Sequence, residues 1–174
     1  MTEKNNDAII ILGSSRKDGN TKKIVDIFNK DLNFEIVHLI EKNISYYDYE
    51  HKNRDDDFSR VMDKIAEKKL IIFATPVYWY SMSAPLKTFF DRFSDLLNIR
   101  RDIGEKLIGK QMMVISCGSS PIDYDFCFPF RETAGYMNMN YIGDIHGWMF
   151  TDTIPEEVKT KIEAFSKNLK ALRI

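Results

Sequence analysis

Three short segments combine small, polar and aromatic residues in patterns that suit ligand binding. The first is GSSRKDGNT (13–21), which follows an apolar run and precedes an amphipathic stretch. Its hydroxyl and amide side chains are neutral hydrogen-bonding groups, Arg16 adds a fixed positive charge, and Gly19 permits a turn. A helix that begins after such a loop presents unpaired N–H groups and the positive end of its dipole. The segment therefore suits a terminal phosphate, and a simple polar turn is the alternative.

Two common nucleotide-binding motifs do not match this segment. A P-loop has the pattern G-x-x-x-x-G-K-[ST], but Gly19 lies six positions after Gly13 and is followed by Asn20 instead of lysine. A dinucleotide fingerprint has the pattern G-x-G-x-x-G, and Ser15 occupies the position of its second glycine. A terminal phosphate is thus a better candidate ligand than a bridging pyrophosphate.

The second segment, TPVYWYSMSAPLKTFFDR (75–92), contains three consecutive aromatic residues in a predicted connection. Connecting loops are usually small and polar because they lie in water. Tyr78, Trp79 and Tyr80 offer flat apolar surfaces with polar edges, and Pro76 restricts the backbone before them. We interpret the rings as a wall for a flat heterocycle whose polar rim is met by backbone groups. The alternative is that they cover a hydrophobic seam or a subunit contact.

The third segment, SCGSSPIDYD (116–125), is rich in small residues. Small side chains let the backbone approach a ligand closely. An ordinary turn would have a similar composition. Its position favours ligand binding, because this segment follows an apolar run, as the other two segments do.

The elements that would hold these segments alternate between strands and helices. Short apolar runs predict strands at Ala8–Leu12, Phe34–Leu39, Leu70–Ala74, Gln111–Ser116 and Tyr141–Ile145. Amphipathic patterns and caps predict helices at Asn20–Asp31, Asp55–Lys68, Ala84–Leu97, Pro129–Met137 and Pro155–Leu172. Five such units predict a parallel sheet with helices on both faces. Ligands of these sheets bind beyond the carboxyl ends of the strands, where the three segments are expected to meet.

Composition limits the class of protein. The 174 residues, with no internal repeat or linker-like stretch, predict a single domain over 1–174. The formal charge of −1, from 25 basic and 26 acidic residues, argues against a nucleic-acid or membrane footprint. Only two cysteines occur, Cys117 and Cys127, and the apolar run at the start is too short for a signal peptide or a membrane span. We expect a cytoplasmic protein with reduced thiols.

With these motifs the sequence resembles the NADPH-dependent FMN reductase family of flavodoxin-like proteins. The resemblance covers roughly residues 8–141, and the aromatic segment is its more specific part. It implies an α/β fold of the flavodoxin-like, doubly wound type, in which five parallel strands follow the order 2-1-3-4-5, and one non-covalent FMN. By position, it implies that the phosphate is held by Ser14, Arg16, Asn20 and Thr21. The isoalloxazine would be framed by Pro76, Val77, Tyr78, Trp79 and Tyr80. Its other edge would be lined by Cys117, Gly118 and Ser119.

One region departs from a related branch of the family. Iron–sulfur flavoproteins carry a compact cysteine cluster between the second strand and the following helix. Here that region reads EKNISYYDYEHKNRDDDFS (41–59) and contains no cysteine. We therefore expect a solvated, charged loop there and no metal site in the protein.

A bound flavin brings its own redox chemistry, so the sequence is not expected to supply a catalytic side chain. The leading hypothesis is an oxidoreductase in which NAD(P)H reduces FMN, and the electrons pass to a small acceptor such as a quinone or a free flavin. A flavodoxin-type electron carrier is the alternative, although the charge of −1 and the basic residues Arg16 and Lys17 disfavour it. A flavin-dependent sensor is a third possibility, with DYDFCFPF (123–130) as a subunit surface. The resemblance also implies a homodimer.

Overall fold

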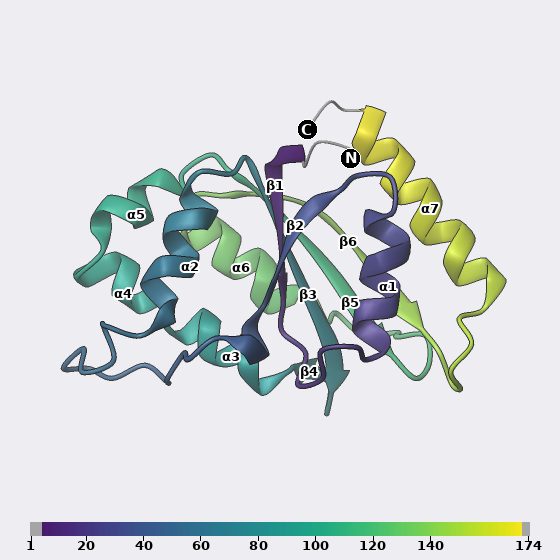
Figure 1. The fold of residues 1–174 in the computed structure, drawn as a ribbon, viewed down its shortest axis with the longest axis horizontal. Helices are drawn as coiled ribbons and strands as arrows, with labels where there is room; N and C mark the ends of the chain where they lie inside the picture. Colours follow the sequence, from purple (N-terminus) through teal and green to yellow (C-terminus); the bar gives the residue numbers. More distant parts are fainter. Residues whose placement is uncertain (1–4, 172–174) are drawn as a thin grey trace.

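A parallel sheet forms the centre of the molecule (Figure 1). The computed structural model describes residues 5–171. The strands lie in the order β2-β1-β3-β5-β6, and a short strand, β4, pairs antiparallel with β3. Their bounds are β1 Asn5–Leu12, β2 Phe34–His38, β3 Leu70–Tyr78, β4 Ser81–Met82, β5 Gln111–Gly118 and β6 Asn140–Trp148. The predicted flavodoxin-like order is confirmed, with β5 and β6 as the fourth and fifth predicted strands.

The central strands are buried on both faces, as their continuous apolar runs predict. Alternate side chains of β1 enter different cores: Ile9 and Ile11 belong to one, and Ile10 and Leu12 to the other. This alternation follows from the two-residue period of a strand. The sheet is therefore the shared wall of two hydrophobic cores.

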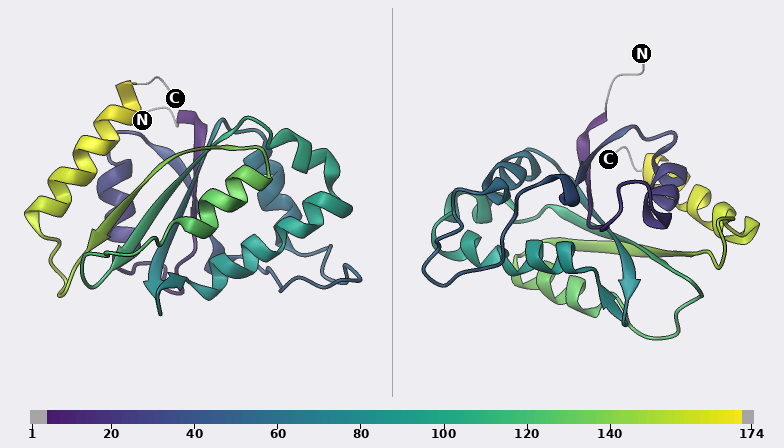
Figure 2. Two further views of the ribbon diagram at one scale, coloured as in Figure 1. Left: turned by 180° about the vertical axis from the view of Figure 1, so that it is seen from behind. Right: turned by 60° about the horizontal axis from the view of Figure 1, so that its bottom comes forward.

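Helices cover both faces of the sheet (Figures 1 and 2). One face is covered by α1 (Asn20–Asn29) and α7 (Glu156–Ala171). The other is covered by α2 (Asp57–Ala66), α3 (Ala84–Asp91), α4 (Phe93–Asn98), α5 (Arg101–Lys106) and α6 (Phe128–Tyr136). A single turn of 3-10 helix, η1 (Leu39–Glu41), follows β2.

The predicted helix over Ala84–Leu97 is wrong as one element, because it is interrupted at Arg92. Arg92 is fully buried, and its guanidinium contacts two carboxylates, Asp56 Oδ2 at 2.5 Å and Asp95 Oδ2 at 2.6 Å. Two further N–H groups donate to the carbonyls of Ser45 and Asn53. A buried charge is tolerated only when it is paired and hydrogen-bonded in this way. Sequence periodicity did not reveal this tertiary requirement, and it also did not predict α5.

Two strands extend further than predicted, into the segments assigned to loops. Thr75 and Pro76 of β3 still pair with Ser116 and Cys117 of β5. A proline donates no hydrogen bond to a sheet, so Pro76 is accommodated close to the end of the ladder. The segments that were predicted to bind a ligand therefore begin inside the sheet, which holds their first residues in place.

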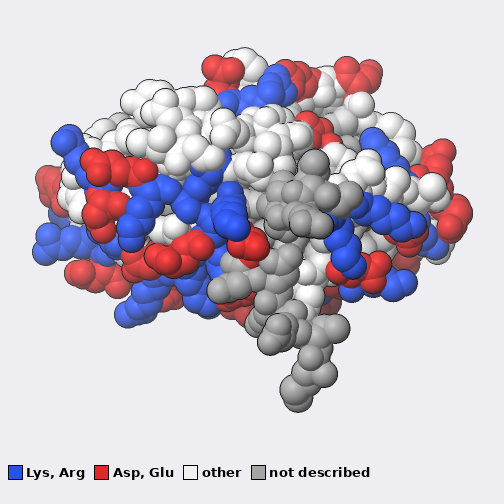
Figure 3. Space-filling model, turned by 90° about the horizontal axis from the view of Figure 1, so that it is seen from above, with Lys and Arg blue, Asp and Glu red and all other residues white. Residues whose placement is uncertain are grey.

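Charged residues of both signs are interleaved on the face shown in Figure 3. This arrangement agrees with the formal charge of −1. Within residues 5–171, no helix is both long and apolar enough to cross a membrane.

A junction at Gly13 joins the first two predicted segments. The Gly13 N–H donates to the Ala74 carbonyl at 2.8 Å, and the Gly13 carbonyl accepts from the Ser83 hydroxyl. Ser83 also caps α3, and its N–H donates to Thr75 Oγ1 at 3.0 Å. A Cβ atom on Gly13 would lie 2.5 Å from the Cβ of Leu86, so a larger residue cannot enter without a backbone shift.

Replacing Gly13 by alanine should destabilise the fold by about 1–3 kcal/mol, because the added methyl group overpacks the contact with α3. Urea unfolding measures the effect. Gly135→Ala is the matched control: a Cβ there meets nothing within 4 Å, so its free energy of unfolding should be unchanged or slightly raised. Equal stabilities of the two variants would contradict the packing argument.

Candidate functional site

A cavity of about 270 Å³ lies at the carboxyl ends of β1, β3 and β5. It is lined by Ser14, Arg16, Asn20, Thr21, Pro76, Val77, Tyr78, Cys117, Gly118, Ser119 and Met149. Ten of the twelve residues predicted to bind the cofactor are thus brought together. The other two, Trp79 and Tyr80, line an adjoining cavity of about 440 Å³.

One end of the first cavity has the character of an anion site. Helix α1 begins at Asn20; its N-cap, Gly19, makes no side-chain capping bond, and its first turn holds no acidic residue. Among the described residues, Arg16 is the only charged one in the lining. Its backbone N–H donates to the buried hydroxyl of Ser14 at 3.2 Å, which orders the loop. A positive side chain and an uncapped helix terminus, with no carboxylate in the lining, fit a phosphate dianion.

The thiol of Cys117 forms part of the cavity floor. The residue is buried, and burial raises the pKa of Cys117 to about 11, although a hydrogen bond with Thr21 opposes this shift. The thiol is therefore protonated at neutral pH and unsuited to nucleophilic chemistry.

The aromatic residues form a tight hairpin. Tyr78 pairs with Ser81, which leaves Trp79 and Tyr80 as a two-residue turn. Both have positive φ, 48° and 65°, a conformation that favours asparagine and glycine and costs of order 1 kcal/mol for bulky residues. Their side chains are 93% and 74% exposed, so they do not cover the protein's own core. The strained turn holds two large rings beside the cavities.

The adjoining cavity lies between this hairpin and the loop after β5. Tyr80 and Tyr124 approach edge to face, with ring centroids 5.4 Å apart. The cavity shares Val77, Gly118 and Ser119 with the first, so the two form one continuous hollow. Residues 120–124 also line it, and they belong to the third predicted segment without having been assigned to the site.

Two further residues were missed by sequence reasoning. Met149 lines the first cavity, and its N–H donates to the Gly118 carbonyl at 3.2 Å. His146 lies beneath the third segment, buried, with Nε2 3.0 Å from the Ser120 carbonyl and Nδ1 2.8 Å from Ser116 Oγ. His146 and Met149 reach the site because β6 lies beside β5 in the sheet. The sequence contains no motif that would have predicted either residue.

The hydrogen bonds of His146 define its proton position. A carbonyl oxygen can only accept, so Nε2 carries the proton, and in the neutral ring Nδ1 accepts from the Ser116 hydroxyl. Burial lowers the pKa of His146, which keeps the ring neutral. A Cβ on Gly118 would lie only 3.2 Å from the His146 ring. The imidazole therefore supports the loop whose backbone lines both cavities.

Within residues 5–171, no group of three or more His, Cys, Asp or Glu side chains is arranged to hold a metal ion.

The sequence of residues 7–148 matches the family of NADPH-dependent FMN reductases. The chain belongs to this family. The predicted family is confirmed.

Named relatives agree with this assignment. The chain is 32% identical over 117 residues to YwqN of Bacillus subtilis, which is described as an NAD(P)H-dependent FMN-containing oxidoreductase; the match covers 63% of this chain and 65% of the relative. It is 33% identical over 144 residues to an iron–sulfur flavoprotein of Archaeoglobus fulgidus, with 75% and 60% covered. The chain thus spans less than two thirds of the length of these two relatives.

Solved structures share the fold at lower sequence identity. The Trp repressor binding protein from Bacillus subtilis superposes with a TM-score of 0.71 and 24% identity, over 93% of this chain and 96% of that one. An FMN-dependent NADH-azoreductase from Bacillus anthracis, in complex with FMN, gives a TM-score of 0.68 and 11% identity, over 93% and 98%. These likenesses confirm the flavodoxin-like fold.

Replacing His146 by leucine should weaken FMN binding about tenfold, because the Ser120 carbonyl and the Ser116 hydroxyl would lose their partner. His146→Gln should recover part of the affinity, since its amide can donate to Ser120. Quenching of FMN fluorescence measures the dissociation constant, and urea unfolding reports stability separately. Unchanged FMN affinity in a destabilised His146→Leu variant would show that the histidine supports the fold alone.

Proposed function

We propose that this protein transfers electrons from NAD(P)H, through FMN bound in the first cavity, to a small planar acceptor such as a quinone or a free flavin. The observation that supports this most is the continuous hollow at the sheet edge. One end suits a phosphate, and the other is walled by exposed aromatic rings. When bound, FMN supplies the redox chemistry, and the protein's task is to bind, orient and exclude water.

Each part of the hollow has a separate task in this proposal. Ser14, Arg16, Asn20 and Thr21 hold the phosphate at the start of α1. Pro76, Val77 and Tyr78 frame the ring system on one side, and Cys117, Gly118 and Ser119 line its other edge. Trp79 and Tyr80 extend the wall into the adjoining cavity.

The adjoining cavity is the proposed place for the acceptor. Its lining contains one charged residue, Asp123, together with aromatic and small residues. Flat aromatic walls favour planar molecules through stacking. A single carboxylate favours neutral or cationic acceptors over anionic ones, which agrees with a quinone.

An electron carrier without nicotinamide turnover is the second candidate. Its supporting observation is that Trp79 is 93% exposed at the rim, where a protein partner could contact it. The near-neutral formal charge disfavours it, because docking carriers usually present a surface of one sign.

We also keep two expectations as proposals. The protein is proposed to be cytoplasmic, and this is supported by two buried cysteines that are not joined to each other. It is further proposed to form a homodimer.

The purified protein should be yellow or take up FMN, and it should oxidise NADPH or NADH when a quinone or free flavin is added. Absorption spectra and nicotinamide oxidation at 340 nm are the measurements, with a protein-free control. Uptake of FMN without oxidation of either nucleotide would favour the electron carrier. A colourless protein that takes up no FMN would contradict both candidates.

Replacing Arg16 by alanine should weaken FMN binding at least tenfold, because it removes a charged partner of the phosphate. The affinity for riboflavin, which has no phosphate, should be unchanged. Lys17→Ala is the matched control: Lys17 is paired with Glu41 at 2.5 Å and does not line the cavity, so neither affinity should change. Equal losses for FMN and riboflavin in Arg16→Ala would place the phosphate elsewhere.

A further inference from the structure

Two charged residues line the continuous hollow at the sheet edge, within the part of the chain that the structure describes. Arg16 lines the first cavity, and Asp123 lines the adjoining one. Arg16 is assigned to the flavin phosphate in the function proposed above. The carboxylate of Asp123 is therefore the charge that a second ligand meets when it enters beside the flavin.

The charge of Asp123 is not neutralised by another residue of the range 5–171. Asp123 is exposed and takes part in no ion pair there. Asp125 shows the contrast, because both of its carboxylate oxygens accept from the guanidinium of Arg131. Burial raises the pKa of Tyr124, and the nearby charges of Tyr80 and Asp123 add to this shift. The negative charge of Asp123 thus acts on the ring pair that walls the adjoining cavity.

The rest of this lining suits a nucleotide. Ser119 and Ser120 offer hydroxyl groups, and Trp79 and Tyr80 offer flat rings. Hydroxyl groups can bond to a ribose, and aromatic faces stack on heterocyclic rings. Because electron donor and acceptor must reach the same flavin, they are expected to occupy the adjoining cavity in turn.

NADH and NADPH differ by one phosphate group on the adenosine ribose. A phosphate monoester carries a charge of about −1.5 to −2 at neutral pH. A carboxylate accepts a hydrogen bond from the free 2′-hydroxyl of NADH, whereas sites for NADPH place an arginine near the 2′-phosphate. Repulsion between like charges extends over about 8 Å at physiological ionic strength, so it does not require direct contact.

Basic residues that flank the lining segments in the chain already have acidic partners. Each of the following forms an ion pair with a carboxylate: Lys17, Lys22, Lys23, Lys87 and Arg131. A 2′-phosphate at the hollow would have to compete with these carboxylates. The charge balance beside the hollow therefore disfavours the phosphorylated nucleotide.

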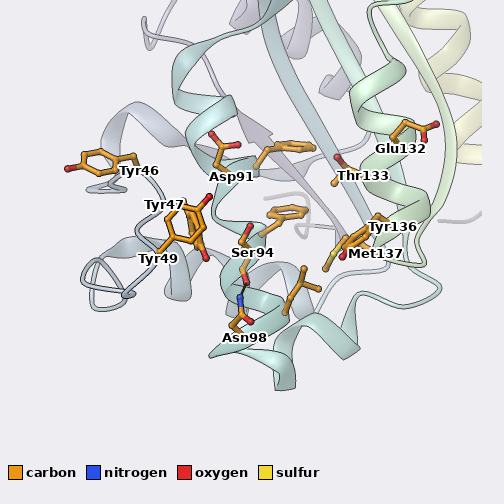
Figure 4. Close-up of a pocket in the computed structure, with 13 residues that line it drawn as sticks. Tyr46, Tyr47, Tyr49, Asp91, Ser94, Asn98, Glu132, Thr133, Tyr136 and Met137 are labelled. Atoms are coloured by element: carbon orange, nitrogen blue, oxygen red, sulfur yellow. Dashed lines mark hydrogen bonds between the residues drawn. The ribbon is translucent and has the colours of Figure 1, made fainter.

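A larger open groove of about 1070 Å³ offers no better place for the phosphate. Figure 4 shows its three sides, which are the tyrosine segment (residues 46–49), helices α3 and α4, and helix α6. Among the described residues of its lining, the charged ones are Asp91 and Glu132, and both are acidic. An additional phosphate is disfavoured there as well.

We propose, building on the function given above, that Asp123 determines nucleotide specificity and makes the protein accept NADH in preference to NADPH. The carboxylate accepts from a ribose hydroxyl and repels the 2′-phosphate. Either nucleotide delivers the same hydride to FMN, with one proton taken from solvent, so the phosphate changes binding and not the chemistry. This preference differs from the NADPH named in the description of the family.

Rapid anaerobic mixing of the FMN-loaded protein with each nucleotide tests the proposal. At low nucleotide concentration, NADH should bleach the flavin absorbance at least tenfold faster than NADPH. The ratio should fall as salt is added, because the repulsion is screened. Asp123→Asn should reduce the ratio at least threefold, and Asp123→Lys should reverse the preference.

Glu157→Gln is the matched control, because it removes the same charge from an exposed position of α7 outside both cavities. Its ratio should equal that of the wild type. Calorimetric titration of the FMN-loaded protein with NAD⁺ and NADP⁺ measures the same choice without electron transfer. If neither reduced nucleotide bleaches the flavin, the proposed function fails, and the titration still tests the choice of nucleotide. NADP⁺ that binds as tightly as NAD⁺, binding of neither, or a preference that Asp123→Asn leaves unchanged would overturn the role of Asp123.

Discussion

The close contact between Gly13 and the start of α3 is the constraint on which the candidate site depends. It brings the loop after β1 against the end of β3, and the Ser83 hydroxyl joins the two through the Gly13 carbonyl. Parallel strands end at one edge of a sheet, but the edge alone does not determine how closely two loops approach. The glycine allows the loop after β1 and the aromatic hairpin to lie beside the same hollow.

The two ends of the hollow differ in character: charge distinguishes the end at α1, and the shape of the aromatic wall distinguishes the end at the hairpin. Its α1 end offers a positive side chain and an uncapped helix terminus, and no carboxylate lines that cavity. Its hairpin end presents rings in a strained turn, where the backbone cost is compensated by the surrounding sheet. Between them, the support from His146 fixes the loop after β5. A redox cofactor carries its own chemistry, so a rigid binding site matters more for it than reactive side chains do.

Arg92 and its buried polar partners determine the local structure in another part of the molecule, away from the candidate site. This buried cation interrupts a helix, binds two aspartates and anchors the tyrosine segment. The segment 41–59 contains no cysteine, and it carries tyrosines on an anchored backbone. The candidate site and the centre around Arg92 lie on different parts of one scaffold.

The sequence by itself predicted five of the strands, most of the helices and ten residues of the cavity, whereas the strand order came from the resemblance to a known family. It could do so because apolar periodicity and loop chemistry are local properties of the chain. Only the tertiary structure revealed the helix break at Arg92, the hairpin turn at Trp79 and Tyr80, and the places of His146 and Met149. Each of these depends on contacts between segments distant in the chain, such as Arg92 with Asp56 or His146 with Ser120. A buried charge or an imidazole acquires its role from the partners that folding brings to it, and those partners leave no pattern in the sequence around it.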